Sequence, residues 1–191
     1  MLTPPAVNQP EVLSDPTLSS YREQLVEYAF VSELLQDGWI RRRQRIDVLR
    51  ADVDGAGYDV VIDCQGVIRH VQLKSTMIGG RARAQNINSA LAAQPSGCVV
   101  WVVLQASDEH RVRLSYLVFG SNAGSPLPAL ANYRVAKHAK ANAKGIKTLR
   151  PAIRVVPRRD FVALEDVAEL SDWLFGPPTN HAVRRAAGTR D

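Results

Sequence analysis

Two apolar segments of the sequence carry polar side chains at a spacing that can bring them together. Asp59 precedes the apolar stretch 60–64, while Gln72 and Lys74 lie two residues apart in the stretch 67–75. Side chains alternate between the two faces of a strand, so Gln72 and Lys74 share one face. A carboxylate, an amide and an ammonium group would then meet on a small area of sheet. They form either a polar site or a cross-strand ion pair, and exposed ion pairs contribute little to stability.

The turn between these two segments determines which residues face one another. Gln65 and Gly66 predict a tight two-residue hairpin turn. In such a hairpin Cys64 opposes Val67, and the same register puts Asp59 directly opposite Gln72. A one-residue bulge would remove this direct pairing, although it would leave the polar groups near each other.

A further acidic candidate lies on a helix predicted for residues 20–36. Ser20 and Glu23 have the spacing of a capping box, which assigns Glu23 to the helix N-terminus. Glu27 instead shares an apolar stripe with three neighbours, Phe30, Val31 and Leu34. Its carboxylate therefore either reaches the edge of the stripe or points into a site.

The order of predicted elements places these residues in an α/β domain with a mixed α+β sheet. The core has the order α-β-β-β-α-β, with expected elements at 20–36, 39–48, 58–64, 67–75, 81–93 and 98–105. The last of these strands is apolar on both faces, which is typical of a sheet centre. A C-terminal extension adds a strand at 112–119, a helix at 127–143, a strand at 152–156 and a closing helix at 164–174.

The expected domain plan has three parts. A proline-rich flexible arm occupies residues 1–18, a single domain residues 19–175, and a flexible tail residues 176–191. Within the domain, residues 20–105 form the core and residues 106–175 form a basic extension.

Composition excludes several classes of protein. The chain has 191 residues, of which 46% are hydrophobic, so it can bury a core and is not a disordered polymer. The longest apolar run, 98–104, is too short to span a bilayer, and no secretory signal is recognisable at the N-terminus. Cys64 and Cys98 lie in apolar segments and are expected to be reduced core residues. We therefore expect a cytoplasmic protein without a membrane partner.

The formal net charge of +5 is unevenly distributed along the chain. Residues 137–159 contain four Lys and four Arg without an acidic residue, and a second basic cluster follows Trp39. Such clusters are either solvated surface or a polyanion-binding surface, because contacts with phosphate groups release counterions. The candidate phosphate contacts are Arg41, Arg43, Arg81, Arg83, Lys137, Lys140, Lys144 and Lys147.

Together these motifs resemble the PD-(D/E)xK nuclease superfamily. Glu27 with the following AFVSELLQDGW, Gly57-Tyr58-Asp59, and Gln72-Leu73-Lys74 match the family's helix Glu, strand Asp and (D/E)xK tripeptide over roughly residues 20–105. Gln72 departs from the usual acidic residue, and in this it is similar to Mrr-type restriction endonucleases and related bacterial domains. The resemblance implies a restriction-endonuclease-like fold.

The resemblance also implies a catalytic role for Glu27, Asp59, Gln72 and Lys74. Asp59 would bind Mg2+ or Mn2+ directly beside the Gln72 amide oxygen and the Leu73 carbonyl, with Glu27 completing the shell. Lys74 would hold the attacking water or stabilise the charged phosphate. The implied activity is hydrolysis of DNA in defence or repair, with sequence specificity supplied by the domain itself, a homodimer or a partner protein.

Two alternatives stay open at this point. One is a catalytically silent nucleic-acid-binding module that keeps the nuclease fold, which Gln72 favours. The other is a protein-interaction domain whose basic surface meets an acidic protein.

Overall fold

The computed structural model describes residues 15–51, 55–107, 111–141 and 145–178. It confirms the mixed α+β class. Six strands form a mixed sheet in the order β1-β2-β3-β5-β6-β9, and three more form a second sheet in the order β4-β8-β7. All neighbouring strands are antiparallel except β3 and β5. In the large sheet the strands are β1 (Ile46–Arg50), β2 (Val60–Cys64), β3 (Val67–Met77), β5 (Gly97–Ala106), β6 (Val112–Gly120) and β9 (Val162–Leu164).

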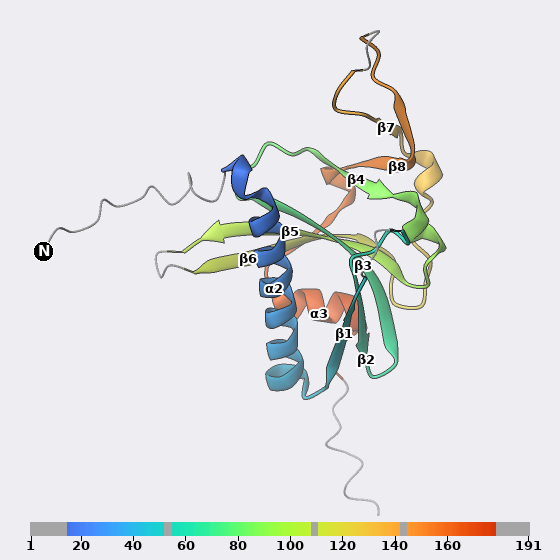
Figure 1. Ribbon diagram of the computed structural model, residues 1–191. Helices are drawn as coiled ribbons and strands as arrows, with labels where there is room; N and C mark the ends of the chain where they lie inside the picture. Colours follow the sequence, from blue (N-terminus) through green and yellow to red (C-terminus); the bar gives the residue numbers. More distant parts are fainter. Residues whose placement is uncertain (1–14, 52–54, 108–110, 142–144, 179–191) are drawn as a thin grey trace, which may run out of the picture.

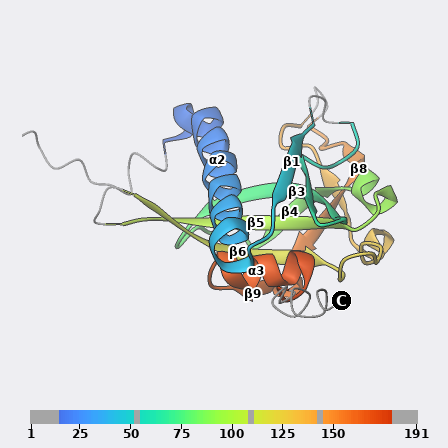
Figure 2. The ribbon, with the colours of Figure 1, turned by 90° about the horizontal axis from the view of Figure 1, so that it is seen from below.

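Three layers result from this arrangement. The helices α2 (Ser19–Asp37) and α3 (Val167–Phe175) pack on one face of the large sheet, and α2 crosses β5 and β6 (Figure 1, Figure 2). The second sheet covers part of the opposite face, and its strands are β4 (Ala84–Asn88), β7 (Val135–Lys137) and β8 (Leu149–Pro157). No helix in the described part of the chain is long and apolar enough to cross a membrane.

The strand β5 separates two hydrophobic cores. Its alternate residues Cys98, Val100, Val102 and Leu104 face the helices, while Val99, Trp101 and Val103 face the second sheet. This confirms the prediction that the segment 98–105 is apolar on both faces and central in the sheet. Both cysteines are buried and free, as expected.

The helix α2 forms because its apolar residues Val26, Phe30 and Leu34 recur at helical spacing and are fully covered by the sheet. Two details differ from the sequence prediction. Leu18, not Ser20, occupies the N-cap position, and no side chain caps the helix, so the predicted capping box is wrong. The chain also continues past Gly38 as a turn of π-helix to Arg42, so the strand predicted for 39–48 begins only at β1.

Two predicted helices are strands and short 3-10 helices instead. The segment 81–93 forms β4 followed by the 3-10 helix Ser89–Ala93. The segment 127–143 forms the 3-10 helix Leu130–Asn132 and β7, with residues 142–144 outside the described part. The physical reason is tertiary, because Ile87, Leu91 and Leu130 are needed to cover the second face of β5. The predicted order α-β-β-β-α-β therefore fails at its second helix.

The turn at Gln65 and Gly66 is confirmed, and it determines the register of β2 and β3. Cys64 pairs with Val67 and Val60 pairs with Val71, as the two-residue loop predicted. Both turn residues have positive φ, 53° and 85°, which is typical of the hairpin turns that match strand twist.

This geometry gives a test of the hairpin. Gly66→Ala should lower the free energy of unfolding by about 1–2 kcal/mol, because a Cβ atom is strained at this φ. The added Cβ meets no atom within 4 Å, so the loss reports backbone strain alone. Chemical denaturation measures it. Gly55→Ala is the matched control, since its Cβ is also free of contacts and its φ is not positive. Equal stability of the two variants would contradict the assigned turn.

Candidate nuclease site

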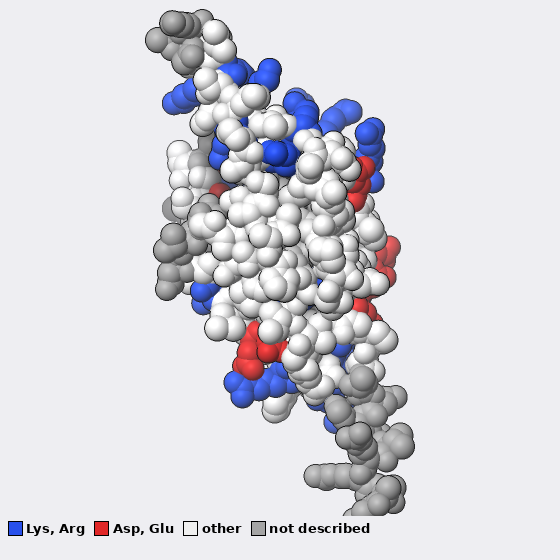
Figure 3. Space-filling view, turned by 90° about the vertical axis from the view of Figure 1, so that its right-hand side faces the viewer, with Lys and Arg blue, Asp and Glu red and all other residues white. Residues whose placement is uncertain are grey.

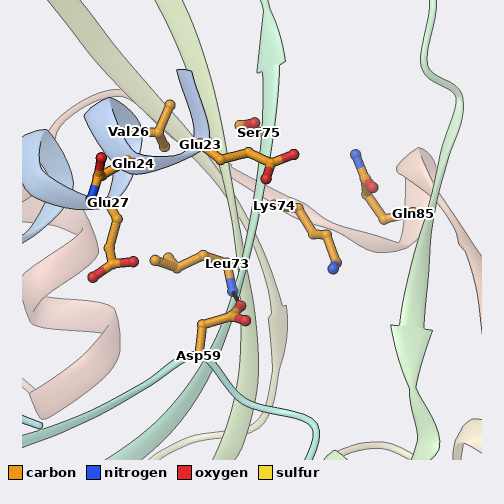
Figure 4. Close-up of a pocket in the computed structure, with 9 residues that line it drawn as sticks. All are labelled: Glu23, Gln24, Val26, Glu27, Asp59, Leu73, Lys74, Ser75 and Gln85. Carbon is orange, nitrogen blue, oxygen red and sulfur yellow. Dashed lines mark hydrogen bonds between the residues drawn. The ribbon is translucent and has the colours of Figure 1, made fainter. Parts of the chain in front are cut away.

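A pocket of about 540 Å³ opens beside the start of β2, where β3 extends past β2 and pairs only with β5. Its walls come from the first turns of α2, from Asp59 just before β2, from the middle of β3 and from β4 (Figure 4). The lining residues are Glu23, Gln24, Val26, Glu27, Asp59, Leu73, Lys74, Ser75 and Gln85. The volume lies within the range of small-ligand sites.

Asp59 is held by the backbone at the end of the β2–β3 ladder. Its N–H donates to the Val71 carbonyl at 2.9 Å, and its Oδ2 accepts the Leu73 N–H at 2.6 Å. The regular ladder ends one residue earlier, at Val60 and Val71. Asp59 is therefore not directly opposite Gln72, which corrects the sequence prediction. Its carboxylate instead lies against the backbone of the Gln72-Leu73-Lys74 tripeptide.

Lys74 and Leu73 point to opposite sides of β3 within this pocket. The Lys74 side chain extends toward Gln85 on β4, and the Leu73 side chain extends toward α2 (Figure 4). The Lys74 side chain makes no hydrogen bond or ion pair with any residue in the described part of the chain. Its ammonium group is therefore available to a ligand in the pocket.

Glu27 reaches the pocket from α2 but is already partnered. Its Oε1 accepts a hydrogen bond from Nε of Arg50 at the end of β1, and the two form an ion pair. The Arg50 guanidinium also stacks over the Tyr28 ring at 5.0 Å from the ring centre. Glu27 and Lys74 lie on opposite sides of Leu73 (Figure 4). Glu27 therefore shares the pocket with Asp59 and Lys74 without facing Gln72.

Gln72 lies outside the pocket lining. It is 5% exposed, and its Oε1 accepts the N–H of Asn88 on β4 at 3.3 Å. The side chain thus links the large sheet to the second sheet. Of the four residues predicted to be catalytic, Glu27, Asp59 and Lys74 line one pocket, whereas Gln72 is buried between the two sheets.

Sequence reasoning missed four polar residues of the pocket, Glu23, Gln24, Ser75 and Gln85. Glu23 had been assigned to a capping box that does not form, and its carboxylate extends toward the side of β3 that carries Lys74 (Figure 4). The spacing of Glu23 and Glu27, one helical turn apart, was the available signal. The place of Gln85 in the pocket could not be predicted, because its segment was expected to form a helix and it forms β4 instead.

The pocket offers oxygen ligands to a metal ion, with carboxylates from Glu23, Glu27 and Asp59. Within the described residues, no three His, Cys, Asp or Glu side chains are close enough together to hold one ion as they lie. Mg2+ commonly keeps several waters and uses one or two carboxylates plus substrate phosphates. The donor set therefore fits a Mg2+ ion that is completed by water and substrate.

The predicted phosphate contacts fall into three groups. Arg81 and Arg83 are exposed between β3 and β4. Lys137, Lys140 and Lys147 are exposed at or near the β7–β8 hairpin rather than on the predicted helix, and Lys144 lies outside the described residues. At the end of α2, Arg43 is exposed, whereas Arg41 is engaged by Asp37 and Asp172. Arg41 thus serves to join α2 to α3, and we no longer expect it to bind phosphate.

Comparison of the chain with protein-family models, with curated proteins and with solved structures gave no match.

The position of Gln72 generates a stability prediction. Gln72→Glu should lower the free energy of unfolding at pH 7 by about 1–3 kcal/mol, because it places a charge in a buried position with one N–H donor. Burial raises the pKa of such a carboxyl group, so the loss should shrink as the pH falls and the group is protonated.

Denaturation at pH 7 and pH 4.5 measures this effect, with Gln85→Glu as the matched control at a partly exposed position of the pocket. Undiminished stability of Gln72→Glu at pH 7 would show that the side chain can turn into the pocket.

Proposed function

We propose that this chain is a divalent-metal-dependent nuclease acting on DNA, of the PD-(D/E)xK type with Gln72 in place of the acidic residue of the (D/E)xK tripeptide. The observation that carries the proposal is the hydrogen bond from the Leu73 N–H to the Asp59 carboxylate. It joins Asp59 to the QLK tripeptide, and Asp59 and Leu73 line one pocket with Lys74 and two carboxylates of α2.

The chemistry requires a negative pocket for a cation and a positive group for the phosphate. A bound Mg2+ ion would lower the pKa of the attacking water and neutralise charge on the phosphate. Asp59 would hold the metal, because its carboxylate is fixed by the Leu73 N–H. Glu23 and Glu27, which lie on α2, would bind the metal through bridging water molecules.

Lys74 would act on the phosphate itself. Its ammonium group lies on the side of β3 where the pocket meets β4 (Figure 4). There it can hold a nonbridging phosphate oxygen while water adds to phosphorus and the bond to the leaving sugar oxygen breaks. Positive charge aimed at a phosphate that gains charge in the transition state is an effective way to stabilise that state. Defence and repair are the settings that we propose for this activity.

One specific observation favours the silent nucleic-acid-binding module as a second candidate. The Gln72 side chain accepts a hydrogen bond from the Asn88 N–H, and Glu27 forms an ion pair with Arg50. Two of the four expected catalytic groups therefore have structural partners. Such a module would bind DNA through its basic surface without cleaving it.

An exposed apolar face on α2 favours the second alternative, a protein-interaction domain. Tyr28 and Leu35 are 51% and 43% exposed, and Trp39 at the end of the helix is 81% exposed. A domain with only this function would show no steep salt dependence of DNA binding.

The proposal predicts that cleavage depends on two residues of the pocket. Asp59→Asn and Lys74→Ala should each reduce the Mg2+-dependent cleavage rate by about 100-fold or more, because each removes charge that acts on the metal or the phosphate. Asn keeps an oxygen that can accept the Leu73 N–H, so the first variant should stay folded. Plasmid and oligonucleotide cleavage with Mg2+ or Mn2+, with and without a chelator, measures the effect.

Asp47→Asn is the matched control, because Asp47 is an exposed acid on β1 that does not line the pocket. Its cleavage rate should equal that of the wild type. Full activity in both pocket variants would place the chemistry elsewhere, and DNA binding without any cleavage by the wild type would favour the silent module.

A further inference from the structure

The helix α2 carries a second apolar stripe, on the side that faces away from the sheet. Tyr21, Tyr28 and Leu35 follow one another at seven-residue spacing, which places them on one face of the helix. The π-helical turn after α2 extends the stripe with Trp39 and Ile40. All five residues are exposed. We call them the outer stripe.

The outer stripe contains no charged residue. The polar residues that adjoin it, Ser32 and Gln36, are neutral. At its edge, Glu27 and Arg50 form an ion pair with each other. Lys and Arg side chains gather instead at the upper end of Figure 3, which is the end where β7 and β8 lie in Figure 1. Because interface cores are depleted in charge and rich in aromatic residues, the outer stripe fits a protein partner rather than a polyanion.

The same surface carries both a hollow and a protruding ring. The hollow of about 410 Å³ lies among Tyr28, Leu35, Trp39 and Ile40, in the C-terminal half of the outer stripe. The Tyr21 ring does not line it and lies two turns before Tyr28, near the start of α2. In packed helices, a side chain of one helix inserts into a hole between side chains of the other. The outer stripe therefore contains both halves of a self-complementary contact.

We propose that the outer stripe binds the outer stripe of a second copy of this chain, with the two α2 helices antiparallel. Tyr21 of each copy then enters the hollow beside Leu35 of the other copy, and the two Tyr28 rings meet near the two-fold axis. A two-fold pair brings the same surface together twice, so an uncharged stripe can meet itself without repulsion between like charges. This inference does not depend on the proposed nuclease function.

The area of the outer stripe agrees with a reversible dimer. Tyr21, Tyr28 and Trp39 are 67%, 51% and 81% exposed, and an aromatic side chain offers roughly 200 Å², so the three rings expose about 400 Å². Leu35 and Ile40 raise the exposed area to about 600 Å², so that two stripes would bury about 1,200 Å², at the lower end of stable interfaces. We therefore expect a dissociation constant of about 1–50 µM.

Sedimentation velocity of the full chain over about 1–200 µM measures this association. The mass should rise from monomer to dimer, and the dimer should persist in about 0.5 M NaCl, because salt screens charges and this interface has none. Leu35→Glu should weaken the dimer about 30-fold or more, since it places a charge in the buried interface. Leu149→Glu is the matched control, because it makes the same substitution at an exposed residue on β8 and should leave the dissociation constant unchanged.

A second variant tests the protruding ring. Tyr21→Ala should weaken the dimer about tenfold or more, although Tyr21 does not line the hollow. Neither Tyr21 nor Leu35 packs in or against the two hydrophobic cores, so both variants should stay folded. Chemical denaturation of each variant as a monomer checks this.

Disulfide formation tests the direction of the two helices. Both native cysteines are buried, so a cysteine introduced on the outer stripe is the accessible thiol. When the Tyr21→Cys and Leu35→Cys proteins are mixed and oxidised with copper phenanthroline, they should form a mixed disulfide. Neither should link to itself, because about 21 Å of helix separates the two positions and a disulfide requires Cα atoms within about 7 Å.

A dimer that both outer-stripe variants weaken, together with the mixed disulfide, supports the proposal. A wild-type chain that stays monomeric at about 200 µM would overturn it and assign the outer stripe to a different protein. A dimer that neither variant weakens, or that Leu149→Glu weakens equally, would overturn the location of the interface. Disulfides of each cysteine variant with itself would overturn the antiparallel arrangement.

Discussion

The strand β5 is buried on both of its faces, and this burial determines where the helices and the second sheet must pack. Its residues from Gly97 to Leu104 are all buried, so an apolar cover is required on each side of the sheet. The helices α2 and α3 supply the first cover, and the second sheet supplies the other. Because β3 and β5 run parallel, the chain between them must cross the sheet, and it uses that crossing to form β4.

The pocket is a consequence of this crossing. As β4 lies over the second face, Gln85 comes opposite Lys74, and α2 closes the site from the other side. The ladder between β2 and β3 stops just before this point, which frees the Leu73 N–H for the Asp59 carboxylate. The Asp59 carboxylate is thus held by the Leu73 N–H, which is free because the β2–β3 ladder has ended. The direction of the Lys74 side chain follows from the alternation of side chains along β3. Charges of opposite sign are held in one pocket without neutralising each other in a direct ion pair.

Features set by local chemistry could be predicted from the sequence. The Gln65-Gly66 turn, the register that it imposes, the helix around Phe30 and the two-sided apolar strand all follow from spacing and residue type. The proximity of Asp59 and Lys74 followed from these elements, whereas the place of Glu27 in the pocket was expected only from the resemblance to the nuclease superfamily. The mutual orientation of these side chains could not be predicted, because the ladder ends at Val60 and Val71 and the next pair, Asp59 with Gln72, does not form.

Features set by tertiary demand could not be predicted in the same way. The segment 81–93 has the composition of a helix, yet it forms β4 because Ile87 must cover the second core. The burial of Gln72 follows from that change, since its amide oxygen accepts an N–H that exists only when β4 is a strand. Arg41 was expected to contact phosphate, and one of its two acidic partners, Asp172, lies far away in the sequence.

The proposed function requires Asp59 to hold a divalent metal in the pocket beside Lys74. Anomalous diffraction from crystals grown in millimolar Mn2+ tests it most directly. We expect a manganese peak within about 2.0–2.6 Å of an Asp59 carboxylate oxygen, with the Lys74 ammonium group on the same side of β3. A well-ordered pocket without a peak, or a peak bound only by residues elsewhere in the fold, would contradict it.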